Sequence, residues 1–391
     1  MTFPARDPSA GRFVIDARYV EPRPSGIGRY VEALVERLPR LDERQCFHFW
    51  THPARPWPVT GPNVSASPVA APSDGLRTLL TPHRLGRLNP NDVVHFPFSL
   101  LGRGLPCATV VTVHDLMWLE QPHLVEGRPL MRQVRKHYYQ RGMRWALERA
   151  TRLIAVSEAT RARMLAVAPA CEGRVVVTHN AADTRFAPPE DAGAAARVAA
   201  AVIGSAAPYF LVVGKNEPYK GHEVALRAFA RAALDDELLV LIQRATGARR
   251  LLGLAERLGV APRLRFLPAV SGEQLLALLQ SARALLQPSL IEGFGIPAVE
   301  AMASGCPVIG SDTPALLEVL GGAGLQAEAG DDAELARRLR ELREPGVRES
   351  LRARGLARAR AFDWDRTARA TLEVYREAAA AFARAQREPA R

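Results

Sequence analysis

The sequence is poor in cysteine, and its cysteines follow none of the patterns in which this residue usually acts. Only four occur among 391 residues, without CxxC spacing and without histidines at metal-ligand spacing. A disulfide framework and a zinc finger are therefore excluded, and we expect reduced, mostly buried thiols of a cytoplasmic protein. The four residues are Cys46, Cys107, Cys171 and Cys306.

Long apolar runs are also missing. No stretch reaches the roughly 18 residues that a membrane span requires, and Met1–Arg12 contains no apolar core of signal-peptide length. We expect a soluble, cytoplasmic protein. The sequence also lacks a DxD-type metal motif in a suitable loop, an RRM-type signature and a basic motif interleaved with aromatic residues. We therefore expect no bound metal and no nucleic-acid partner.

Positive charge is abundant. The formal net charge is +11 and the isoelectric point is near 10.1, largely because of arginines scattered along the chain. Such charge attracts nucleic acid, anionic lipid and anionic substrates alike, and it is equally compatible with arginine on solvated helix faces. Each basic residue near an anionic membrane contributes about 1 kcal/mol to binding. A peripheral contact with the inner face of the membrane therefore stays open.

Strand-like and helix-like segments alternate along the whole chain, which is typical of α/β proteins with parallel sheets. The length favours two to three domains, and a hydrophobic content of 48% is ample for their cores. We predict two sheets of five or six strands each. The expected strands are Phe13–Ala17, Cys46–Trp50, Val93–Phe96, Thr109–His114, Leu153–Ser157, Val175–His179, Phe210–Gly214, Leu238–Gln243, Leu264–Pro268, Ala284–Gln287 and Pro307–Ser311.

Composition changes suggest where the chain divides. Pro188–Pro208, in which prolines and acids precede an alanine-rich stretch, is predicted to be an interdomain hinge. Thr51–Ser73 is rich in proline, alanine and serine and is predicted to be an irregular surface connection. Amphipathic helices are expected between the strands and after Asp331. They include Arg29–Leu38, Val224–Leu234, Arg249–Leu258, Gly272–Ser281, Asp332–Arg343, Arg348–Ala361 and Trp364–Arg384.

The most informative segment is Glu292–Glu300 (EGFGIPAVE), which follows a short apolar strand and sets two carboxylates eight positions apart. Gly293 and Gly295 allow the backbone to approach a ligand closely, and Pro297 suits the first turn of a helix. The N–H groups at a helix start favour an anion. Glu300 has apolar neighbours, so we expect it to be buried and to need a partner, either a ribose hydroxyl or a structural arginine.

With this segment the sequence resembles the retaining glycosyltransferases of GT-B fold, family four. The resemblance implies an α/β protein of two Rossmann-like α/β/α domains that face a central cleft. It also implies that Glu292 approaches the donor sugar and that Glu300 binds the nucleotide ribose. The backbone groups that would hold sugar and phosphate oxygens are those of Gly293, Phe294, Gly295 and Ile296.

Three further loops follow expected strands, where ligands of α/β sheets usually bind. Lys215 and Lys220 stand before Gly221 in a loop that resembles the family's diphosphate-binding loop, although Lys215 replaces an arginine and cannot offer a bidentate fork. His114 ends another strand, and the resemblance gives it a contact with a sugar hydroxyl. The third loop is the glycine-rich turn Gly26, Ile27 and Gly28, which by resemblance lies against the donor diphosphate.

The resemblance assigns the domains as well. Residues 1–190 would bind the acceptor, residues 205–362 would bind the nucleotide sugar, and residues 363–391 would form a helix that packs back on the first domain. The resulting hypothesis is a retaining, metal-independent glycosyltransferase without a cofactor. It would move a hexose or deoxyhexose, with a mannose-like sugar favoured, from a GDP- or UDP-linked donor to an acceptor hydroxyl.

The acceptor would be a glycan or a lipid-linked molecule, because the sequences around His114 and Gly26–Tyr30 look most like those of enzymes that build bacterial surface polysaccharide. Two alternatives stay open. One is a basic binding protein for anionic lipid or nucleic acid without enzymatic activity. The other is a nucleotide-sugar epimerase of the same fold. A phosphorylase would need a cofactor lysine that no motif supplies.

Overall fold

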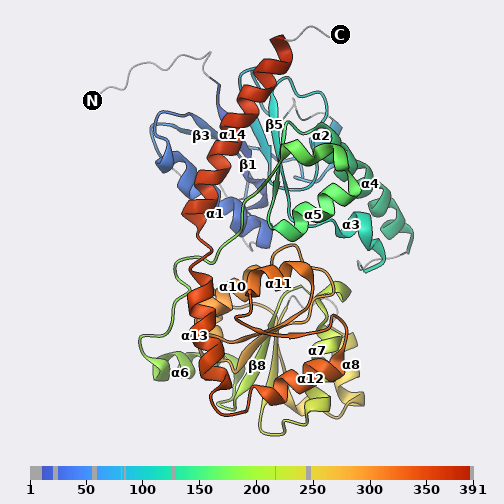
Figure 1. Cartoon of the computed structure of the whole chain (residues 1–391), viewed down its shortest axis with the longest axis vertical. Helices are drawn as coiled ribbons and strands as arrows, with labels where there is room; N and C mark the ends of the chain where they lie inside the picture. The colour runs from blue at the N-terminus through green and yellow to red at the C-terminus, as the bar shows by residue number, and fades with distance from the viewer. Residues whose placement is uncertain are drawn as a thin grey trace. The chain divides into compact units, whose positions relative to one another are not determined.

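The computed structural model describes residues 11–20, 25–54, 60–80, 82, 85–124, 129–215, 217–243 and 248–387. These residues fall into two compact units (Figure 1). The first unit takes in the described parts of Met1–Gln121, Pro129–Asn180 and Trp364–Arg391, and the second those of Pro122–Arg128 and Ala181–Asp363. Residues 1–10, which make up most of the segment predicted to contain no signal peptide, lie outside the described residues.

The first unit is built on a seven-stranded sheet in which all neighbouring strands are parallel, in the order β3-β2-β1-β4-β5-β6-β7. Its central strands are mostly apolar and buried along their whole length, as expected for a parallel sheet covered on both faces. The strands are β1 (Phe13–Asp16), β2 (Phe47–Thr51), β3 (Val64–Pro68), β4 (Val93–Phe96), β5 (Ala108–Val113), β6 (Arg152–Ala155) and β7 (Val175–Val177).

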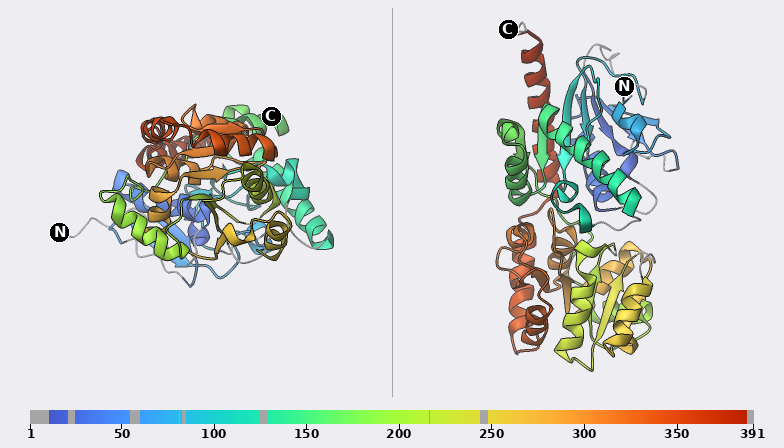
Figure 2. Two further views of the ribbon diagram at one scale, coloured as in Figure 1. Left: turned by 90° about the horizontal axis from the view of Figure 1, so that it is seen from below. Right: turned by 90° about the vertical axis from the view of Figure 1, so that its right-hand side faces the viewer.

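The second unit has a six-stranded sheet, again entirely parallel, in the order β10-β9-β8-β11-β12-β13. Helices cover both faces of each sheet (Figure 2). The strands are β8 (Tyr209–Val213), β9 (Leu238–Ile242), β10 (Leu264–Leu267), β11 (Ala284–Gln287), β12 (Val308–Ser311) and β13 (Leu325–Ala327).

The described helices of the first unit are α1 (Gly26–Leu41), α2 (Leu76–Leu80), α3 (Met117–Glu120), α4 (Pro129–Arg149), α5 (Glu158–Val167) and α14 (Trp364–Arg387). Those of the second unit are α6 (Ala192–Ile203), α7 (His222–Ala232), α8 (Ala248–Arg257), α9 (Gly272–Ser281), α10 (Ile296–Ala303), α11 (Pro314–Leu320), α12 (Asp332–Glu341) and α13 (Val347–Ala359).

The last helix, α14, belongs to the first unit and lies along its sheet beside α1 (Figure 1). Among the described residues, three exposed ion pairs connect it to the rest of that unit: Arg37 with Asp365 at 2.8 Å, Arg376 with Asp42 at 2.8 Å, and Arg152 with Glu377 at 3.2 Å. Exposed ion pairs contribute little stability. The buried side of the helix, with Leu372 and Tyr375 in the core, therefore dominates its attachment.

Three predictions about the sheets and the hinge are wrong. Thr51–Ser73 is not wholly irregular, because it contains the edge strand β3, whose mostly exposed VSASP sequence gives no apolar run. Because β3 belongs to it, the first sheet has seven strands rather than five or six. The three-residue strand β13 of the second sheet was not predicted either, because it also lacks an apolar run. Pro188–Pro208 is not a crossing between units, because it contains α6 and lies within the second unit, which the chain has already entered at Ala181.

The cysteines agree with expectation: all four are free, and every one except Cys46 is buried. Within the described part of the chain, none of the helices combines the length and the hydropathy that crossing a membrane would need.

Because each unit has its own buried core, Phe229→Ala is expected to destabilise the second unit alone. Phe229 on α7 is fully buried in the core of the second unit, and loss of such a ring costs about 3–5 kcal/mol. The residues of the second unit contain no tryptophan, so tryptophan fluorescence follows only the first unit during urea unfolding, whereas far-UV circular dichroism follows both. We expect an earlier transition by circular dichroism and an unchanged midpoint by fluorescence. Equal shifts of both midpoints would show that the chain unfolds as one unit.

Candidate functional site

The segment from β11 to α10 forms the loop and helix that the sequence predicts. Gly295 precedes the first helical residue with φ +106°, and a Cβ there would lie 2.8 Å from Leu316 Cδ2, so only glycine fits without a shift. Pro297 lies in the first turn, and the helix ends at Ala303 with Ser304 as its C-cap, followed by Gly305 at φ +74°. The tight turn brings the amino end of α10 to the carboxyl edge of the sheet. The N–H of Ile296 there precedes the first hydrogen bonds of the helix, which Ala298 and Val299 donate to the Gly295 carbonyl.

Lys220 and Glu292 form an ion pair at this edge. Lys220 Nζ lies 3.1 Å from Oε1 and 2.8 Å from Oε2 of Glu292, and the two side chains are 22% and 11% exposed. Gln287, the last residue of β11, donates from Nε2 to Glu292 Oε2 at 3.2 Å. Partial burial reduces solvent screening, so this pair interacts more strongly than one on the open surface.

The position of Lys220 depends on a close contact between two loops. After β8 the chain makes a short 3₁₀ turn, Pro218–Lys220, and enters α7 through Gly221 at φ +68°. A Cβ on Gly221 would lie 2.0 Å from the carbonyl oxygen of Pro288. The N–H of Leu290 donates to the carbonyl of Tyr219 at 2.7 Å. The two loops are therefore joined backbone to backbone, which places Lys220 beside Glu292.

The structure does not bring the other predicted cation of this loop to the pair. Lys215 follows Gly214 and is exposed, and among the described residues it takes part in no ion pair. Glu300 lies farther along α10 and is 2% exposed, which confirms that this carboxylate is buried. Gly293, Phe294 and Ile296 connect Glu292 to α10 as predicted.

His222 is a site residue that the sequence analysis missed. It opens α7 directly after Gly221, is 3% exposed, and neither ring nitrogen has a hydrogen-bond partner among the described residues. Burial, and then the nearby charge of Lys220, lower its pKa to about 4. The ring is therefore neutral at physiological pH and has both a donor and an acceptor to offer beside Lys220. Its position after a Lys-Gly pair was the available signal.

The predicted residues of the first unit lie at the start of α1 and the end of β5. Gly26, Ile27 and Gly28 form the first turn of α1, because Ser25 caps the helix by accepting from the N–H of Gly28 at 3.1 Å. The prediction that the helix begins at Arg29 is therefore wrong by one turn. The missed signal is the serine before the glycine pair, which is a favoured N-cap residue.

His114 follows β5 and has a defined protonation state. Burial lowers its pKa to about 4, so the imidazole is neutral. Its Nε2 lies 3.1 Å from the carbonyl oxygen of Pro97, which can only accept, so the proton is on Nε2 and Nδ1 is an acceptor. The carboxylate of the next residue, Asp115, accepts from the N–H of Met117, the first residue of α3, at 3.1 Å.

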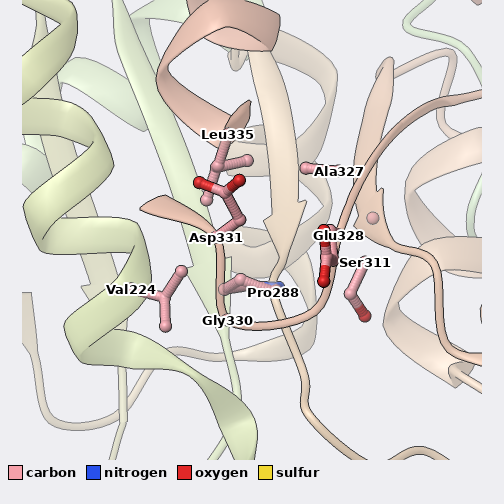
Figure 3. Close-up of a pocket in the computed structure, with 9 residues that line it drawn as sticks. Val224, Pro288, Ser311, Ala327, Glu328, Gly330, Asp331 and Leu335 are labelled. Carbon is pink, nitrogen blue, oxygen red and sulfur yellow. The ribbon is translucent and has the colours of Figure 1, made fainter. Parts of the chain in front are cut away.

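A small hollow of the second unit lies next to the joined loops (Figure 3). It holds about one water molecule, which is too little for a sugar or a nucleotide. Its lining comprises Val224, Pro288, Gly310, Ser311, Ala327, Glu328, Gly330, Asp331 and Leu335. Across the ranges that the structure covers, no group of three or more histidine, cysteine, aspartate or glutamate side chains is arranged to hold a metal ion.

Both halves of the chain match known sequence families. Residues 199–358 match the family model described as "Glycosyl transferases group 1", and residues 24–186 match "Glycosyltransferase Family 4". The O-antigen chain mannosyltransferase B of Escherichia coli is 30% identical over 289 residues, which cover 73% of this chain and 74% of that protein. A D-inositol 3-phosphate glycosyltransferase of Nocardioides sp. is 31% identical over 322 residues, which cover 74% of this chain and 68% of that protein.

Solved structures resemble the chain over nearly its whole length. Sucrose-phosphate synthase of Thermosynechococcus elongatus superposes with a TM-score of 0.75 at 20% identity, covering 94% of this chain and 98% of that one. WaaG, a glycosyltransferase involved in lipopolysaccharide biosynthesis, gives 0.71 at 16% identity, with 93% and 98% covered. Anabaena HepE in complex with UDP-glucose gives 0.67 at 17% identity, with 93% and 98% covered. At these identities the likeness shows the fold.

Gly221→Ala is expected to disrupt the joined loops. The new Cβ meets the Pro288 carbonyl in addition to the strain of a left-handed backbone, which alone costs about 1–2 kcal/mol. Gly204→Ala is the matched control, because Gly204 has φ +72° and open space around a Cβ. We expect urea unfolding to show a clearly larger loss of stability for Gly221→Ala than for Gly204→Ala. Equal losses would mean that the loops do not depend on this contact.

Proposed function

The chain belongs to the group 1 glycosyltransferases, and from this premise we propose that it is a retaining enzyme that moves a hexose or deoxyhexose from a nucleoside diphosphate to an acceptor hydroxyl. The family and the two-domain GT-B fold that the motifs predicted are confirmed by the family matches and the structural likeness. That the protein is a glycosyltransferase follows from the family. The donor, the acceptor, the stereochemistry and the independence from metal are the proposal.

The single observation that carries the proposal is the partly buried Lys220 beside Glu292 at the amino end of α10. A cation and a helix amino terminus side by side favour a dianionic diphosphate. Support for this ligand class comes from the structural neighbour that was solved with UDP-glucose. Lys215, exposed after β8, would add charge to the same edge of the sheet.

The proposed reaction breaks the bond between the anomeric carbon of the donor sugar and the phosphate oxygen, and forms a bond from that carbon to the acceptor oxygen. The nucleoside diphosphate departs with the electron pair, and its phosphate takes the proton of the acceptor hydroxyl. Negative charge develops on the leaving group, where Lys220 and the α10 N–H groups would stabilise it. Preorganised charge of this kind is a large catalytic contribution.

The carboxylates and His114 would act on the sugar and the ribose. Glu292 accepts hydrogen bonds only, so it would bind sugar hydroxyls once the donor phosphate draws Lys220 away. Neutral His114 would accept a hydrogen bond from a sugar hydroxyl through Nδ1, because Nε2 already donates to the Pro97 carbonyl. Glu300, buried on α10, would bind the ribose hydroxyls. A mannose-like sugar and a surface-polysaccharide acceptor are favoured by the mannosyltransferase among the relatives.

We expect Glu292→Gln to have opposite effects on turnover and on nucleotide binding. The variant keeps the shape of the side chain but removes the charge that holds Lys220, so the free cation should bind UDP or GDP more tightly. Sugar transfer by Glu292→Gln should fall roughly a hundredfold, whereas Lys220→Met should lose both sugar transfer and nucleotide binding. The assay is nucleotide release from a panel of UDP-, GDP- and dTDP-sugars, with calorimetry for binding.

A chelator should leave the rate of release unchanged if cationic side chains replace a metal. An unchanged rate in both variants would contradict the assigned roles of Lys220 and Glu292. If the wild-type protein released no nucleotide from any of these donors and no nucleotide raised its melting temperature, the proposed transfer from a nucleoside diphosphate sugar would be refuted.

A lipid-linked acceptor would require contact with a membrane, and α4 offers a basic face for it. The described part of this helix exposes Arg135, Arg141, Arg144 and Arg149 but only one acid, Glu148, and its cations make no ion pair among the described residues. Val134 on the same helix is 56% exposed. Clustered cations around an exposed apolar residue suit the surface of an anionic bilayer.

Arg141→Gln/Arg144→Gln should weaken binding to vesicles that contain anionic phosphatidylglycerol by roughly thirtyfold, since each cation contributes about 1 kcal/mol. Arg227→Gln/Arg249→Gln is the control, because it removes equal charge from exposed positions of the second unit. Sedimentation with the vesicles gives the affinity. The membrane contact would be refuted by equal weakening in both double variants, or by wild-type binding that does not depend on anionic lipid.

A further inference from the structure

Beneath His114 lies a buried chain of hydrogen bonds that connects four elements of the first unit. The hydroxyl of Tyr375 lies 2.7 Å from His95 Nδ1, and His95 Nε2 lies 2.8 Å from Thr112 Oγ1. The hydroxyl of Tyr30 lies 2.9 Å from the same Thr112 oxygen. All four side chains are fully buried. This series of hydrogen bonds therefore connects α14 with α1 through β4 and β5.

The protonation states of this network are fixed by burial. Burial, and then the neighbouring His114, lower the pKa of His95 to about 3, so its ring is neutral. Burial raises the pKa of both Tyr30 and Tyr375, so both phenols keep their protons. A neutral imidazole has one donor and one acceptor, which the hydroxyls on either side can satisfy in either direction. An uncharged hydrogen-bond network thus holds the hydroxyl group of Tyr30 in place.

The ring of Tyr30 is also in contact with His114. The two ring centres lie 5.0 Å apart with an interplanar angle of 84°, which is the edge-to-face geometry that aromatic pairs favour. Tyr30 also packs against Trp364 at the start of α14, with the ring centres 6.2 Å apart. Tyr30 therefore contacts both the last helix and the candidate site residue.

Two contacts then define the orientation of the His114 ring. The hydrogen bond to Pro97 decides which nitrogen faces the protein, because only Nε2–H can donate to that carbonyl. It does not by itself fix the plane of the ring. The edge-to-face contact with Tyr30 does so, because rotation of the imidazole out of this plane would lose the contact. Together they leave Nδ1 as a hydrogen-bond acceptor in one defined direction.

We propose that Tyr30 is a positioning residue for sugar transfer. It would hold the His114 ring so that Nδ1 accepts a hydrogen bond from a hydroxyl of the donor sugar. The proposal rests on the proposed function, because it gives His114 a sugar hydroxyl to bind. Tyr375 and His95 extend the support to α14, so the last helix contributes to the site without contacting the substrate. The motif Gly26–Tyr30 then has a second purpose besides opening α1.

The test compares Tyr30→Leu, which removes the ring, with Tyr30→Phe, which removes only the hydroxyl. We expect kcat to fall roughly tenfold or more for Tyr30→Leu with little change in donor KM, and to stay near the wild-type value for Tyr30→Phe, because misplacement of a contact group acts on the chemical step. In the His114→Ala background Tyr30→Leu should have no further effect on kcat. Additive losses would overturn the proposal, since Tyr30 would then act independently of His114.

A second measurement does not need turnover. Long-range ¹H–¹⁵N NMR of the histidine rings should show His114 protonated on Nε2 alone and titrating near pH 4 in the wild type and in Tyr30→Phe. In Tyr30→Leu we expect both tautomers and a pKa closer to the ordinary value. His48, bonded to Ser65 and Ser67 on β3, is the internal control and should not change. Identical His114 signals in all three proteins would overturn the proposal.

Phe47→Leu controls for lost core volume, because Phe47 is a buried aromatic residue of β2 whose described ring contact is Phe13. It should lower stability but leave kcat and the His114 signals unchanged; a change in either would mean that general loosening of the unit explains the effect of Tyr30→Leu. If Tyr30→Leu does not fold, Tyr30→Met fills more of the same space and takes its place. Absence of turnover in every protein would refute the proposed function, while the NMR comparison would still decide the role of Tyr30.

Discussion

The candidate donor site depends on one close backbone contact, the approach of Gly221 to the carbonyl of Pro288. This contact joins the loop after β8 to the loop after β11, and the hydrogen bond from Leu290 to Tyr219 holds them together. Only with the loops joined does Lys220 reach both oxygens of Glu292. The ion pair, the neutral His222 beside it and the start of α10 then share one edge of the sheet. Lys220 can exchange its pairing with the single charge of Glu292 for a pairing with a bound diphosphate, which carries more negative charge.

Around His114 the first unit has neutral groups, whereas the candidate site of the second unit has the charged pair of Lys220 and Glu292. His95 and His114 are both kept neutral by burial, and the tyrosines around them keep their protons. Neutral groups can be packed inside a unit without the desolvation cost of ions. They define directions of hydrogen bonds rather than electrostatic attraction. The proposed division of roles follows: the second unit would stabilise the leaving diphosphate, and the first would orient the sugar.

Much of this could be predicted from the sequence, for identifiable reasons. The central strands are short and mostly apolar, so their positions were predicted correctly, and α9 was predicted at its observed bounds. The edge strand β3 was missed because its exposed serines and alanine give no apolar signal. The pair of Lys220 with Glu292 joins residues 72 positions apart. No local pattern shows that contact. The burial of His222 and the Tyr30–His114 contact depend on packing between distant segments in the same way.

The central claim is that Lys220 and the start of α10 hold a diphosphate. The most direct test is a crystal structure of the protein with a bound nucleoside diphosphate. The account predicts a phosphate oxygen within hydrogen-bonding distance of Lys220 Nζ and of a backbone N–H at the start of α10, with the Glu292 carboxylate no longer paired to Lys220. A diphosphate bound elsewhere, with the Lys220–Glu292 pair intact, would contradict it.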